Sequence, residues 1–147
     1  MVRAPVSIRE LTRDDFPAVI EIDQVIRGFS RPDFWRRRFM IAEFNPPWAS
    51  LVAELDNRVV GFVLGWSSCW EFGLAGEVGW LDIIGVHPTY RREGIGRALV
   101  TEFMNLARNL RQVERVLTLV DPEQFGTMDF FSSIGFARGE LVHLKAP

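Results

Sequence analysis

The spacing of apolar positions changes several times along the chain, between an alternation typical of strands and a three-and-four spacing typical of helices. The clearest helical stripe starts at Ile95, from which apolar residues recur at three and four up to Leu110. The clearest strands are two β-rich runs, 50–55 and 59–68, which Asp56-Asn57-Arg58 separates with the composition of a hairpin turn. We expect these two runs to pair antiparallel.

The other elements follow from the same patterns and from helix-capping signals. A strand at 6–11 should lead into a helix that Thr12 and Asp15 begin with a capping box and that ends near Gly28. The remaining elements are expected, in order, as a helix from about Ser30 that ends before Asn45, an apolar strand at 78–86, the helix at 95–110, a short strand at 115–120, a helix from Pro122 to about Ser133, and a last strand at Leu141–Leu144. This order predicts an α/β (α+β) fold in which a mixed, mostly antiparallel sheet carries helices on both faces. The strands that flank the 95–110 helix should be parallel neighbours.

Composition narrows the class of protein. The chain has 147 residues, of which 48% are hydrophobic, and fits a single domain spanning 1–147. Its 17 basic and 19 acidic residues give a net charge of −2, so no global positive field holds nucleic acid or an anionic membrane. No stretch approaches the roughly 18 apolar residues of a membrane helix, and residues 1–10 lack the apolar region of a signal peptide. The single Cys69 forms no internal disulfide, which suits a reducing compartment, so we expect a cytoplasmic protein.

The most informative segment joins the strand at 78–86 to the helix at 95–110 through a short basic turn that contains Gly94 and Gly96. A helix start presents unpaired N–H groups and the positive end of the helix dipole, and glycines let an oxygen approach them closely. The turn therefore predicts a phosphate site, with a plain strand-to-helix loop as the alternative. Gly96 is followed by Arg and Ala, so the Lys and Ser/Thr of a mononucleotide P-loop are missing. A dinucleotide fold would carry its glycine turn after the first strand.

Two motifs resemble the GNAT superfamily of acyl-CoA-dependent N-acetyltransferases. Arg91-x-x-Gly94-x-Gly96, preceded by Val86-His87-Pro88, is similar to that family's pyrophosphate loop, which reads Gln/Arg-x-x-Gly-x-Gly/Ala after a strand ending Val-x-Pro. The segment 131–136 is similar to a helix-to-strand junction that commonly reads Tyr-x-x-x-Gly-Phe. The element order matches the acyl-CoA N-acyltransferase fold, in which a central parallel strand pair splays apart. The resemblance covers nearly the whole chain.

The resemblance implies acetyl-CoA as the acyl donor. We expect no metal, because His87 and His143 have no Cys or carboxylate at ligand spacing around them. Backbone N–H groups of the basic turn would hold the coenzyme diphosphate, and Arg91 would buttress the turn or reach a phosphate. Unpaired backbone groups at 84–86 would pair with the pantetheine arm and polarise the thioester carbonyl. Gln124 stands where the family often has an asparagine that contacts pantetheine. The cofactor-binding candidates are Ile84, Gly85, Val86, Arg91, Arg92, Glu93, Gly94, Ile95, Gly96, Arg97, Gln124 and Phe131.

Attack of an amine on a thioester needs a base for the amine proton, and an acid can protonate the leaving thiolate. Phe131 occupies the position of the family's usual acid, a tyrosine, and has no proton to give. For the base, Asp82 lies in an apolar strand where an unpaired carboxylate is costly to bury, and Glu77 at the strand's start is its rival. Asp82 can instead be the structural partner of an arginine or a backbone donor. Strand alternation places Asp82 on one face with Trp80 and Ile84.

Two functions remain open. The resemblance implies acetyl transfer, by direct attack in a ternary complex, to a protein N-terminal amine, a lysine or a small-molecule amine. The alternative is a catalytically weak or inactive acyl-CoA-binding sensor or assembly subunit, which the missing tyrosine at Phe131 favours. The run Arg36-Arg37-Arg38 is typical of a solvated helix face. Aromatic residues on the elements that wall the acceptor cleft in this fold either pack in the core or line an acceptor site or a homodimer face: Phe29, Trp35, Trp48, Trp66, Trp70 and Trp80.

Overall fold

A computed structural model of the chain describes residues 5–44, 50–69 and 71–147, without the side chains of residues 41–44, 71 and 125. Trp48 and Trp70, two of the aromatic candidates, therefore lie outside the described residues. The helices and strands are β1 (Ser7–Glu10), α1 (Phe16–Arg27), α2 (Pro32–Phe44), β2 (Leu51–Leu55), β3 (Arg58–Ser68), β4 (Val78–Val86), α3 (Ile95–Arg111), β5 (Arg115–Thr118) and α4 (Phe125–Ser133).

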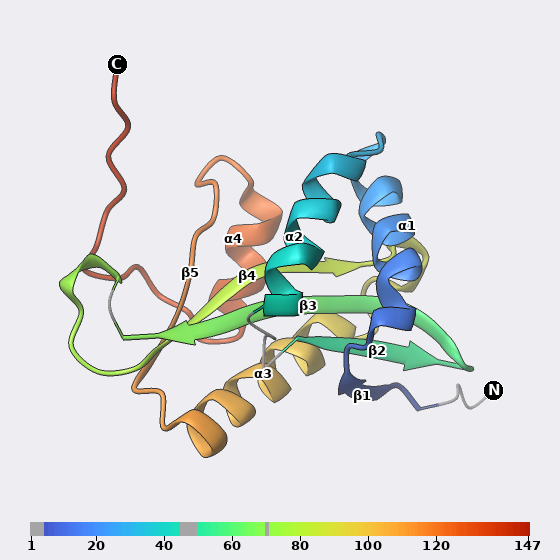
Figure 1. The fold of residues 1–147 in the computed structure, drawn as a ribbon, viewed down its shortest axis with the longest axis horizontal. Coiled ribbons are helices and arrows are strands. Elements are labelled where there is room, and N and C mark those ends of the chain that lie inside the picture. Colours follow the sequence, from blue (N-terminus) through green and yellow to red (C-terminus); the bar gives the residue numbers. More distant parts are fainter. Residues whose placement is uncertain (1–4, 45–49, 70) are drawn as a thin grey trace.

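The five strands form one mixed sheet in the order β1-β2-β3-β4-β5 (Figure 1). The first three pairings are antiparallel, and β4 and β5 are parallel because α3 crosses over between them. Asp56 and Asn57, between β2 and β3, have positive φ angles of 51° and 61°, as the two-residue turn of a tight hairpin requires. The predicted mixed, mostly antiparallel sheet and its hairpin are confirmed.

Helices cover both faces of the sheet, with α1 and α2 on one face and α3 on the other (Figure 1). On the α3 face, the fully buried Leu99 and Phe103 pack in one cluster with Val63 of β3. On the opposite face, Trp35 of α2 packs edge-on against Phe62 of β3, with ring centroids 5.8 Å apart. Each such buried side chain stabilises the fold by about 1.5–3 kcal/mol. β3 is therefore held from both sides, and it supports its neighbour β4.

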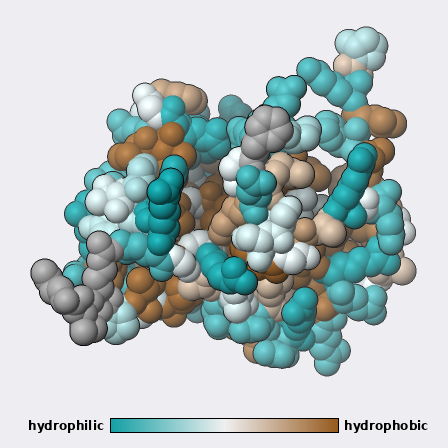
Figure 2. Space-filling model, turned by 180° about the vertical axis from the view of Figure 1, so that it is seen from behind, coloured by the Kyte–Doolittle hydropathy of each residue, from teal (hydrophilic) through white to brown (hydrophobic). Residues whose placement is uncertain are grey.

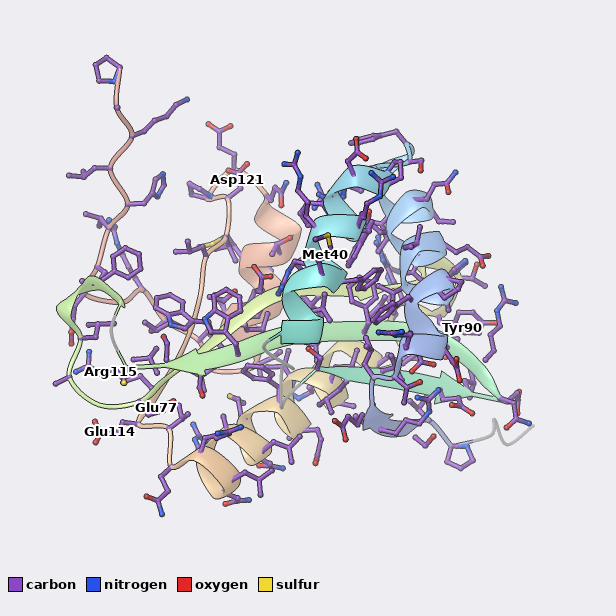
Figure 3. All side chains as sticks on the ribbon, in the orientation of Figure 1. Met40, Glu77, Tyr90, Glu114, Arg115 and Asp121 are labelled. Carbon is purple, nitrogen blue, oxygen red and sulfur yellow. The ribbon has the colours of Figure 1, made fainter. Side chains whose placement is uncertain are left out.

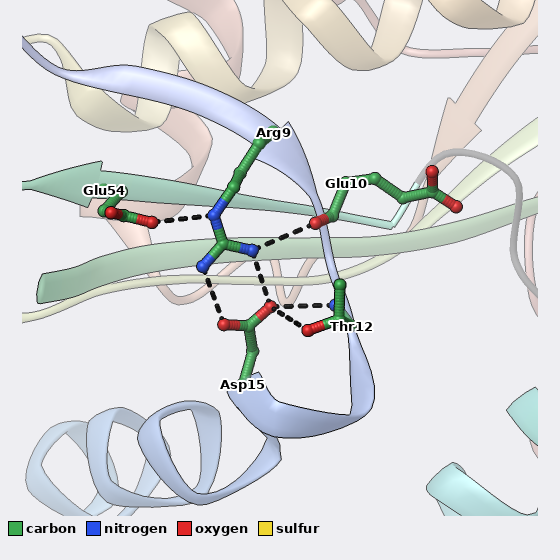
Figure 4. A network of polar contacts seen from close by, with 5 residues as sticks. All are labelled: Arg9, Glu10, Thr12, Asp15 and Glu54. Carbon is green, nitrogen blue, oxygen red and sulfur yellow. Dashed lines mark hydrogen bonds and ion pairs between the residues drawn. The ribbon is translucent and has the colours of Figure 1, made fainter. Parts of the chain in front are cut away.

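A network of polar contacts fixes the start of α1 (Figure 4). Arg9 of β1 donates from two nitrogens to the two carboxylate oxygens of Asp15, each over 2.8 Å, and from Nε to Glu54 of β2 over 2.7 Å. The backbone N–H of Thr12 donates to the same carboxylate over 2.8 Å, so the predicted capping box is present. The hydrogen bonds from Arg9 hold the pKa of Asp15 below its ordinary value, although burial opposes this.

A second buried carboxylate ties α1 to α2. Asp23 is 4% exposed, and it accepts two hydrogen bonds from Arg31 and one from the indole of Trp35, all over 2.8 Å. Arg27 lies one helical turn further on, with its Nε 3.5 Å from the same carboxylate. Burial by itself raises the pKa of Asp23, but the hydrogen bonds from Arg31 and Trp35 outweigh burial and lower the pKa overall. This polar cluster fixes how α2 is placed over the sheet.

Two expectations about the C-terminal part are wrong. Residues 141–144, expected as a strand, form none, because they extend away from the sheet and no neighbouring backbone pairs with them among the described residues (Figure 1). Helix α4 begins at Phe125 rather than at Pro122. The Asp121 carboxylate accepts a hydrogen bond from the Glu123 N–H over 2.9 Å, and this local turn delays the start of the helix.

Within the parts of the chain that the structure describes, no helix is long and apolar enough to cross a membrane. No group of three His, Cys, Asp or Glu residues in those parts is placed to hold a metal ion. Cys69, which follows β3, is exposed.

Candidate active site

The centre of the candidate site is a gap between β4 and β5. The parallel ladder begins at Val78 opposite Arg115 and ends at Leu81 opposite Thr118, where the Thr118 hydroxyl donates to the Leu81 carbonyl over 2.9 Å. β4 continues to Val86, whereas β5 stops at Thr118. The two strands therefore part, and residues 82–86 of β4 have no ladder partner on the β5 side among the described residues. The predicted splayed pair is confirmed.

The direction of the free backbone groups follows from the β3–β4 ladder. The His87 N–H donates to the Val60 carbonyl over 2.8 Å, so residues 83, 85 and 87 direct their N–H and C=O groups to β3. Ile84 and Val86, which lie between them, direct theirs into the gap. Consistent with this, the Val86 carbonyl accepts a contact of 3.4 Å from Arg91 Nε. Of residues 84–86, which were predicted to pair with the pantetheine arm, only Ile84 and Val86 direct backbone groups into the gap.

Gly85 serves the packing of β4 and its pairing with β3, and not the gap. An added Cβ at Gly85 would lie 2.7 Å from a ring carbon of Phe62, so the close packing of β4 against the α1 face needs a glycine at this position. Its backbone serves the ladder with β3. The structure therefore gives Gly85 a packing contact on the α1 face, away from the gap.

A β-bulge in β4 changes the expected faces of its side chains. Leu64 lies opposite Ile83 but Gly65 lies opposite Leu81, so Asp82 is an extra residue without a partner in the pairing. Leu81 and Ile84 both pack in the α3-face core, whereas Ile83 packs in the α1–α2 core. The prediction that Asp82 shares a face with Ile84 is wrong, because simple alternation does not hold across a bulge.

Asp82 lies on the α2 face, where it forms an ion pair with Arg38. Arg38 Nε donates to Asp82 Oδ2 over 2.8 Å, and Nη2 contacts the same oxygen, so Oδ1 is left outside the pair. The two side chains are 16% and 30% exposed, respectively. The guanidinium carbon of Arg38 lies 5.6 Å from the ring centroid of Trp66, which is opposite Trp80 in the β3–β4 pairing. The bulge thus brings a carboxylate, a guanidinium and two indoles together beside the gap.

Glu77, the rival base, lies elsewhere. It precedes β4, its carbonyl accepts from the Glu114 N–H over 3.1 Å, and Figure 3 shows it beside Glu114 and Arg115 at the start of β5. Asp82 lies five positions after Glu77 in extended chain, which corresponds to roughly 16 Å. Figure 3 places Tyr90, in the basic turn, at the opposite end of the molecule from Glu77. The structure therefore does not bring the two predicted carboxylates together.

The basic turn reverses the chain tightly before α3. Arg92 and Gly94 have positive φ angles of 65° and 78°, and Gly94 is the residue before the first helical one. An added Cβ at Gly94 would meet no atom within 4 Å, so glycine is favoured here by backbone conformation and the space beside it is open. The predicted turn residues are thus placed around a helix start that is open to a ligand.

The start of α3 presents free N–H groups. Its first hydrogen bond joins the Ala98 N–H to the Gly94 carbonyl over 3.0 Å, so the N–H groups of residues 95–97 precede any acceptor within the helix. The first turn of α3 contains no acidic residue, and Arg92 and Arg97 are exposed. An added Cβ at Gly96 would lie 3.0 Å from the ring of Phe130, so this glycine allows α4 to pack against α3. The result is an anion-binding helix start next to the gap.

The last two predicted cofactor-binding residues, Phe131 and Gln124, lie in α4 and just before it. Phe131 is 5% exposed and packs in the α3-face core, with its ring centroid 5.1 Å from that of Phe136. Gln124 is exposed and lies just before α4, where its carbonyl accepts from the Thr127 and Met128 N–H groups. The position of the family's tyrosine is thus filled by an apolar core ring.

Sequence reasoning missed Arg38, which was expected on a solvated helix face. Adjacent positions on a helix point in different directions, so only one of the three arginines at 36–38 reaches the sheet. The available signal was Asp82, because a carboxylate in an apolar strand needs a partner. Arg38 and Asp82 are 44 positions apart in the sequence, so the sequence did not identify which cation that partner would be.

Comparisons with known proteins agree with this geometry. The model of the acetyltransferase (GNAT) family matches residues 6–136. An uncharacterized N-acetyltransferase of Methanocaldococcus jannaschii is 28% identical over 92% of this chain, and mycothiol acetyltransferase of Salinispora tropica is 27% identical over 71% of it. An aminoglycoside N-acetyltransferase, AAC(6')-Iy in complex with CoA, superposes with a TM-score of 0.83 and 17% identity, over 98% of this chain and 95% of that one.

The chain matches only part of these two curated relatives, since the alignments cover 62% of the archaeal protein and 35% of mycothiol acetyltransferase. The family match nevertheless covers most of the chain, including the gap, the bulge and the basic turn. The chain therefore belongs to the GNAT family of acetyltransferases.

Proposed function

We propose that the chain transfers an acetyl group from acetyl-CoA to a primary amine, with the donor lying along the gap and its diphosphate at the start of α3. The observation that carries this proposal is that two sets of outward main-chain groups lie at the two ends of one turn. The open edge of β4 ends at Val86 and runs directly into the turn that leads to the free N–H groups of residues 95–97. A long ligand with an anionic part and an amide-bearing arm matches this line of donors and acceptors.

In this arrangement, the N–H groups of residues 92–97 bind the diphosphate. Arg91 contacts the Val86 carbonyl, which supports the role of buttressing the turn. The amides of the pantetheine arm pair with the outward backbone groups of Ile84 and Val86. The N–H of Ile84 then donates to the thioester oxygen and stabilises the negative charge that develops on it.

The reaction is a direct attack. The amine nitrogen forms a bond to the acetyl carbonyl carbon, the carbon–sulfur bond breaks, and the coenzyme leaves as a thiolate. One proton leaves the amine, and we assign Asp82 Oδ1 as its acceptor or as the anchor of the ammonium group. Phe131 donates no proton, so the thiolate departs into water, which a thiolate can do because it is a modest base.

Asp82 is favoured over Glu77 because the bulge places it where the strands part, whereas Glu77 lies beside the paired section of the ladder. Arg38 is a positioning residue in this account. It binds Asp82 through Oδ2 and leaves the other oxygen for the amine. The indoles of Trp66 and Trp80 provide aromatic faces that attract an ammonium group or an apolar substituent.

The acceptor is a small-molecule amine or an amine of a protein. The names of the relatives include mycothiol and aminoglycoside acetyltransferases, which shows that this fold serves chemically different acceptors. The exposed, unpaired Cys69 fits a reducing compartment, so we place the reaction in the cytoplasm.

A second candidate function is acyl-CoA binding without turnover, as a sensor or an assembly subunit. The observation that favours it is Phe131, which fills the position of the family's usual acid with a buried ring. A protein that senses acyl-CoA needs the main-chain donor site but no proton donor.

Purified protein with acetyl-CoA and a panel of peptides, polyamines, amino acids and aminoglycosides tests the two functions, with free thiol as the signal. We expect thiol release with at least one amine. In the Asp82→Asn variant, kcat should fall about 100-fold or more while the acetyl-CoA Kd is unchanged, because general base catalysis contributes at least that factor. Asp33→Asn is the matched control, since Asp33 forms an exposed ion pair with Arg36 on α2.

Calorimetric binding of acetyl-CoA with no thiol release across the panel would support the second function instead. A protein that binds no acetyl-CoA would contradict both. An Asp82→Asn variant with full kcat and an unaltered pH–rate profile would remove Asp82 as the base.

A further inference from the structure

A row of apolar side chains crosses the sheet beside the bulge, on the face that α1 and α2 partly cover. Gly65 and Gly79 face α3, because an added Cβ at either position would contact a side chain of that helix. The next residues, Trp66 and Trp80, therefore point to the opposite face, where they lie across from each other in the β3–β4 pairing. Leu117 of β5 lies across from Trp80 in the β4–β5 pairing and completes the row.

This row is not fully covered by the helices. Its three side chains are half-buried, so each keeps part of its apolar surface exposed. The core under α1 and α2 includes Leu64 of β3, and Figure 1 shows the end of β3 and β5 beside α2 rather than beneath it. Seen from behind, apolar side chains, in brown, lie among hydrophilic ones, in teal (Figure 2). Single apolar side chains on a surface need no occupant, whereas three adjoining ones beside a proposed catalytic group favour a ligand.

Trp80 presents an apolar ring in this row because its polar edge is already bonded. Its indole N–H donates to the Ser68 hydroxyl over 3.0 Å, and Ser68 is 2% exposed. The ring of Phe72 meets Trp80 edge-on, with centroids 5.9 Å apart, and Phe72 is 75% exposed. The indole is thus held in one orientation and has no further donor to offer a polar ligand.

The row lies at a suitable distance from Asp82 to hold the body of an amine. Trp80 and Asp82 point to the same face and are two positions apart in extended chain, which corresponds to roughly 7 Å. A ligand whose ammonium group contacts Asp82 Oδ1 therefore needs only a short linker to place a flat apolar group on Trp80.

The charges around the row are balanced. Arg38 and Asp82 form one ion pair, and Arg115 Nη1, at the start of β5, lies 3.7 Å from the carboxylate of Glu140. A ligand with several positive charges would need a surplus of carboxylates, because an ammonium group placed against apolar side chains without a partner is costly. A ligand with one ammonium group needs only Asp82 Oδ1.

We propose that the acceptor is a small monoamine in which a short linker joins the amino group to an aromatic or similarly flat apolar group. This inference rests on the proposed acetyl transfer and selects one class of acceptor for it. The amino group contacts Asp82, and the apolar group lies against Trp80 and Leu117. Polyamines and aminoglycosides carry several ammonium groups and no flat apolar group, so they are poor acceptors.

Two pairs of amines test the proposal on the unmodified protein, with release of free thiol from acetyl-CoA as the signal. We expect kcat/KM for phenylethylamine to exceed that for ethylamine about 30-fold, because burial of a phenyl group supplies about that factor. Butylamine should exceed putrescine about tenfold, since putrescine differs by a second ammonium group that finds no partner.

Trp80→Leu tests the apolar row, since it removes the ring but keeps an apolar side chain. The preference for phenylethylamine over ethylamine should fall about tenfold, and Trp80→Phe, which keeps a ring, should retain most of it. Phe16→Leu is the matched control, because Phe16 is also a half-buried ring but stacks on Phe39 of α2, with centroids 3.6 Å apart. Its preference should not change, and an unchanged acetyl-CoA Kd shows that each variant is folded.

Leu117→Asp tests the balance of charge by adding a carboxylate to the row. The ratio of kcat/KM for putrescine to that for butylamine should rise about tenfold or more, because the second ammonium group gains a partner. Leu117→Asn has the same shape without the charge and should not raise this ratio.

Equal kcat/KM values for phenylethylamine and ethylamine would overturn the proposal. Faster turnover of putrescine, of an aminoglycoside or of a peptide that begins with phenylalanine than of phenylethylamine would do so too. If no amine released thiol, the proposed acetyl transfer would be contradicted, and the Kd values of the same amines, measured by calorimetry with acetyl-CoA bound, would decide this inference separately. The expected order in Kd would support the amine site, whereas equal Kd values or no binding would contradict it.

Discussion

The two halves of the candidate site are built in different ways. The main-chain half consists of the free N–H groups of residues 95–97 at the start of α3 and of the backbone groups that Ile84 and Val86 direct into the gap. The side-chain half lies on the α2 face, where Arg38 reaches Asp82 across 44 positions of sequence. The proposed donor site can therefore stay fixed while the proposed acceptor site varies. Backbone donors need only glycines and a helix start, whereas the acceptor groups can be replaced one side chain at a time.

The largest expected effect tests the main-chain half. Gly94→Val puts a β-branched residue at a φ of 78° and fills the open space beside the helix start. The acetyl-CoA Kd should rise about 100-fold or more, a loss of about 2.7 kcal/mol, because the N–H groups no longer converge on the diphosphate. Calorimetry with acetyl-CoA measures it.

Gly28→Val is the matched control for that variant. Gly28 has a φ of 80°, an added Cβ there also meets nothing within 4 Å, and it ends α1 far from the basic turn in sequence. Both variants should lose similar stability, about 1–2 kcal/mol, from the left-handed conformation. If both variants also weakened acetyl-CoA binding equally, the main-chain donor site would be contradicted.

The next expected effect concerns Asp15 and Asp23, the two buried carboxylates whose hydrogen bonds support α1 and α2. The pKa values of Asp15 and Asp23 are lowered in the folded state, so both carboxylates stabilise the fold fully above the unfolded value near 4. The free energy of unfolding should be flat from pH 7 to about 5 and should fall as pH drops below about 4, towards the lowered folded pKa values. Urea denaturation at several pH values measures this.

Asp23→Asn should lower the free energy of unfolding by about 2 kcal/mol at pH 7 and should make that free energy less dependent on pH. The loss is smaller than the 3–5 kcal/mol typical of a fully buried pair because Arg31 and Arg27 partly reach solvent. Asp14→Asn, at an exposed carboxylate next to Asp15, is the control, and it should change neither the free energy of unfolding nor its pH dependence. If the free energy of unfolding of Asp23→Asn fell with pH as steeply as that of the unmodified protein, the Asp23 cluster would not be a source of the pH dependence.

The smallest effect separates the two halves directly. Arg38→Met removes the guanidinium that holds Asp82 but keeps an apolar stem beside Trp66. The KM for the amine should rise about tenfold, equivalent to about 1.4 kcal/mol, with the acetyl-CoA Kd unchanged. Arg37→Met, at an exposed neighbouring position, should change neither. A shift in the acetyl-CoA Kd instead would mean that the two halves are not independent.

The contrast also explains what the sequence could predict. The hairpin and the helix start at Ile95 follow from local patterns, because glycines, capping residues and apolar spacing act over a few residues. The splayed strand pair was instead implied by the resemblance to the GNAT family. The face of Ile84 relative to Asp82 could not be predicted, because a bulge shifts the alternation without changing the residue types around it.

Two further features could not be predicted from the sequence, for a different reason. The partner of Asp82 depends on how α2 lies over the sheet, which the Asp23 cluster fixes at a distance. The segment 141–144 has the apolar pattern of a strand, but a strand also needs a neighbouring backbone, and no pattern within the segment states whether that neighbour exists. Local sequence therefore specifies the proposed donor site more fully than the proposed acceptor site.

The most direct test of the central claim compares two ligands on the unmodified protein by calorimetry. Acetyl-CoA carries the diphosphate that we assign to the N–H groups at the start of α3, and S-acetylpantetheine carries the same thioester arm without the diphosphate and the adenosine 3′-phosphate attached to it. The account predicts that acetyl-CoA binds at least about 100-fold more tightly, because charge-assisted hydrogen bonds at a helix start supply that difference. Equal affinity for the two ligands would contradict it.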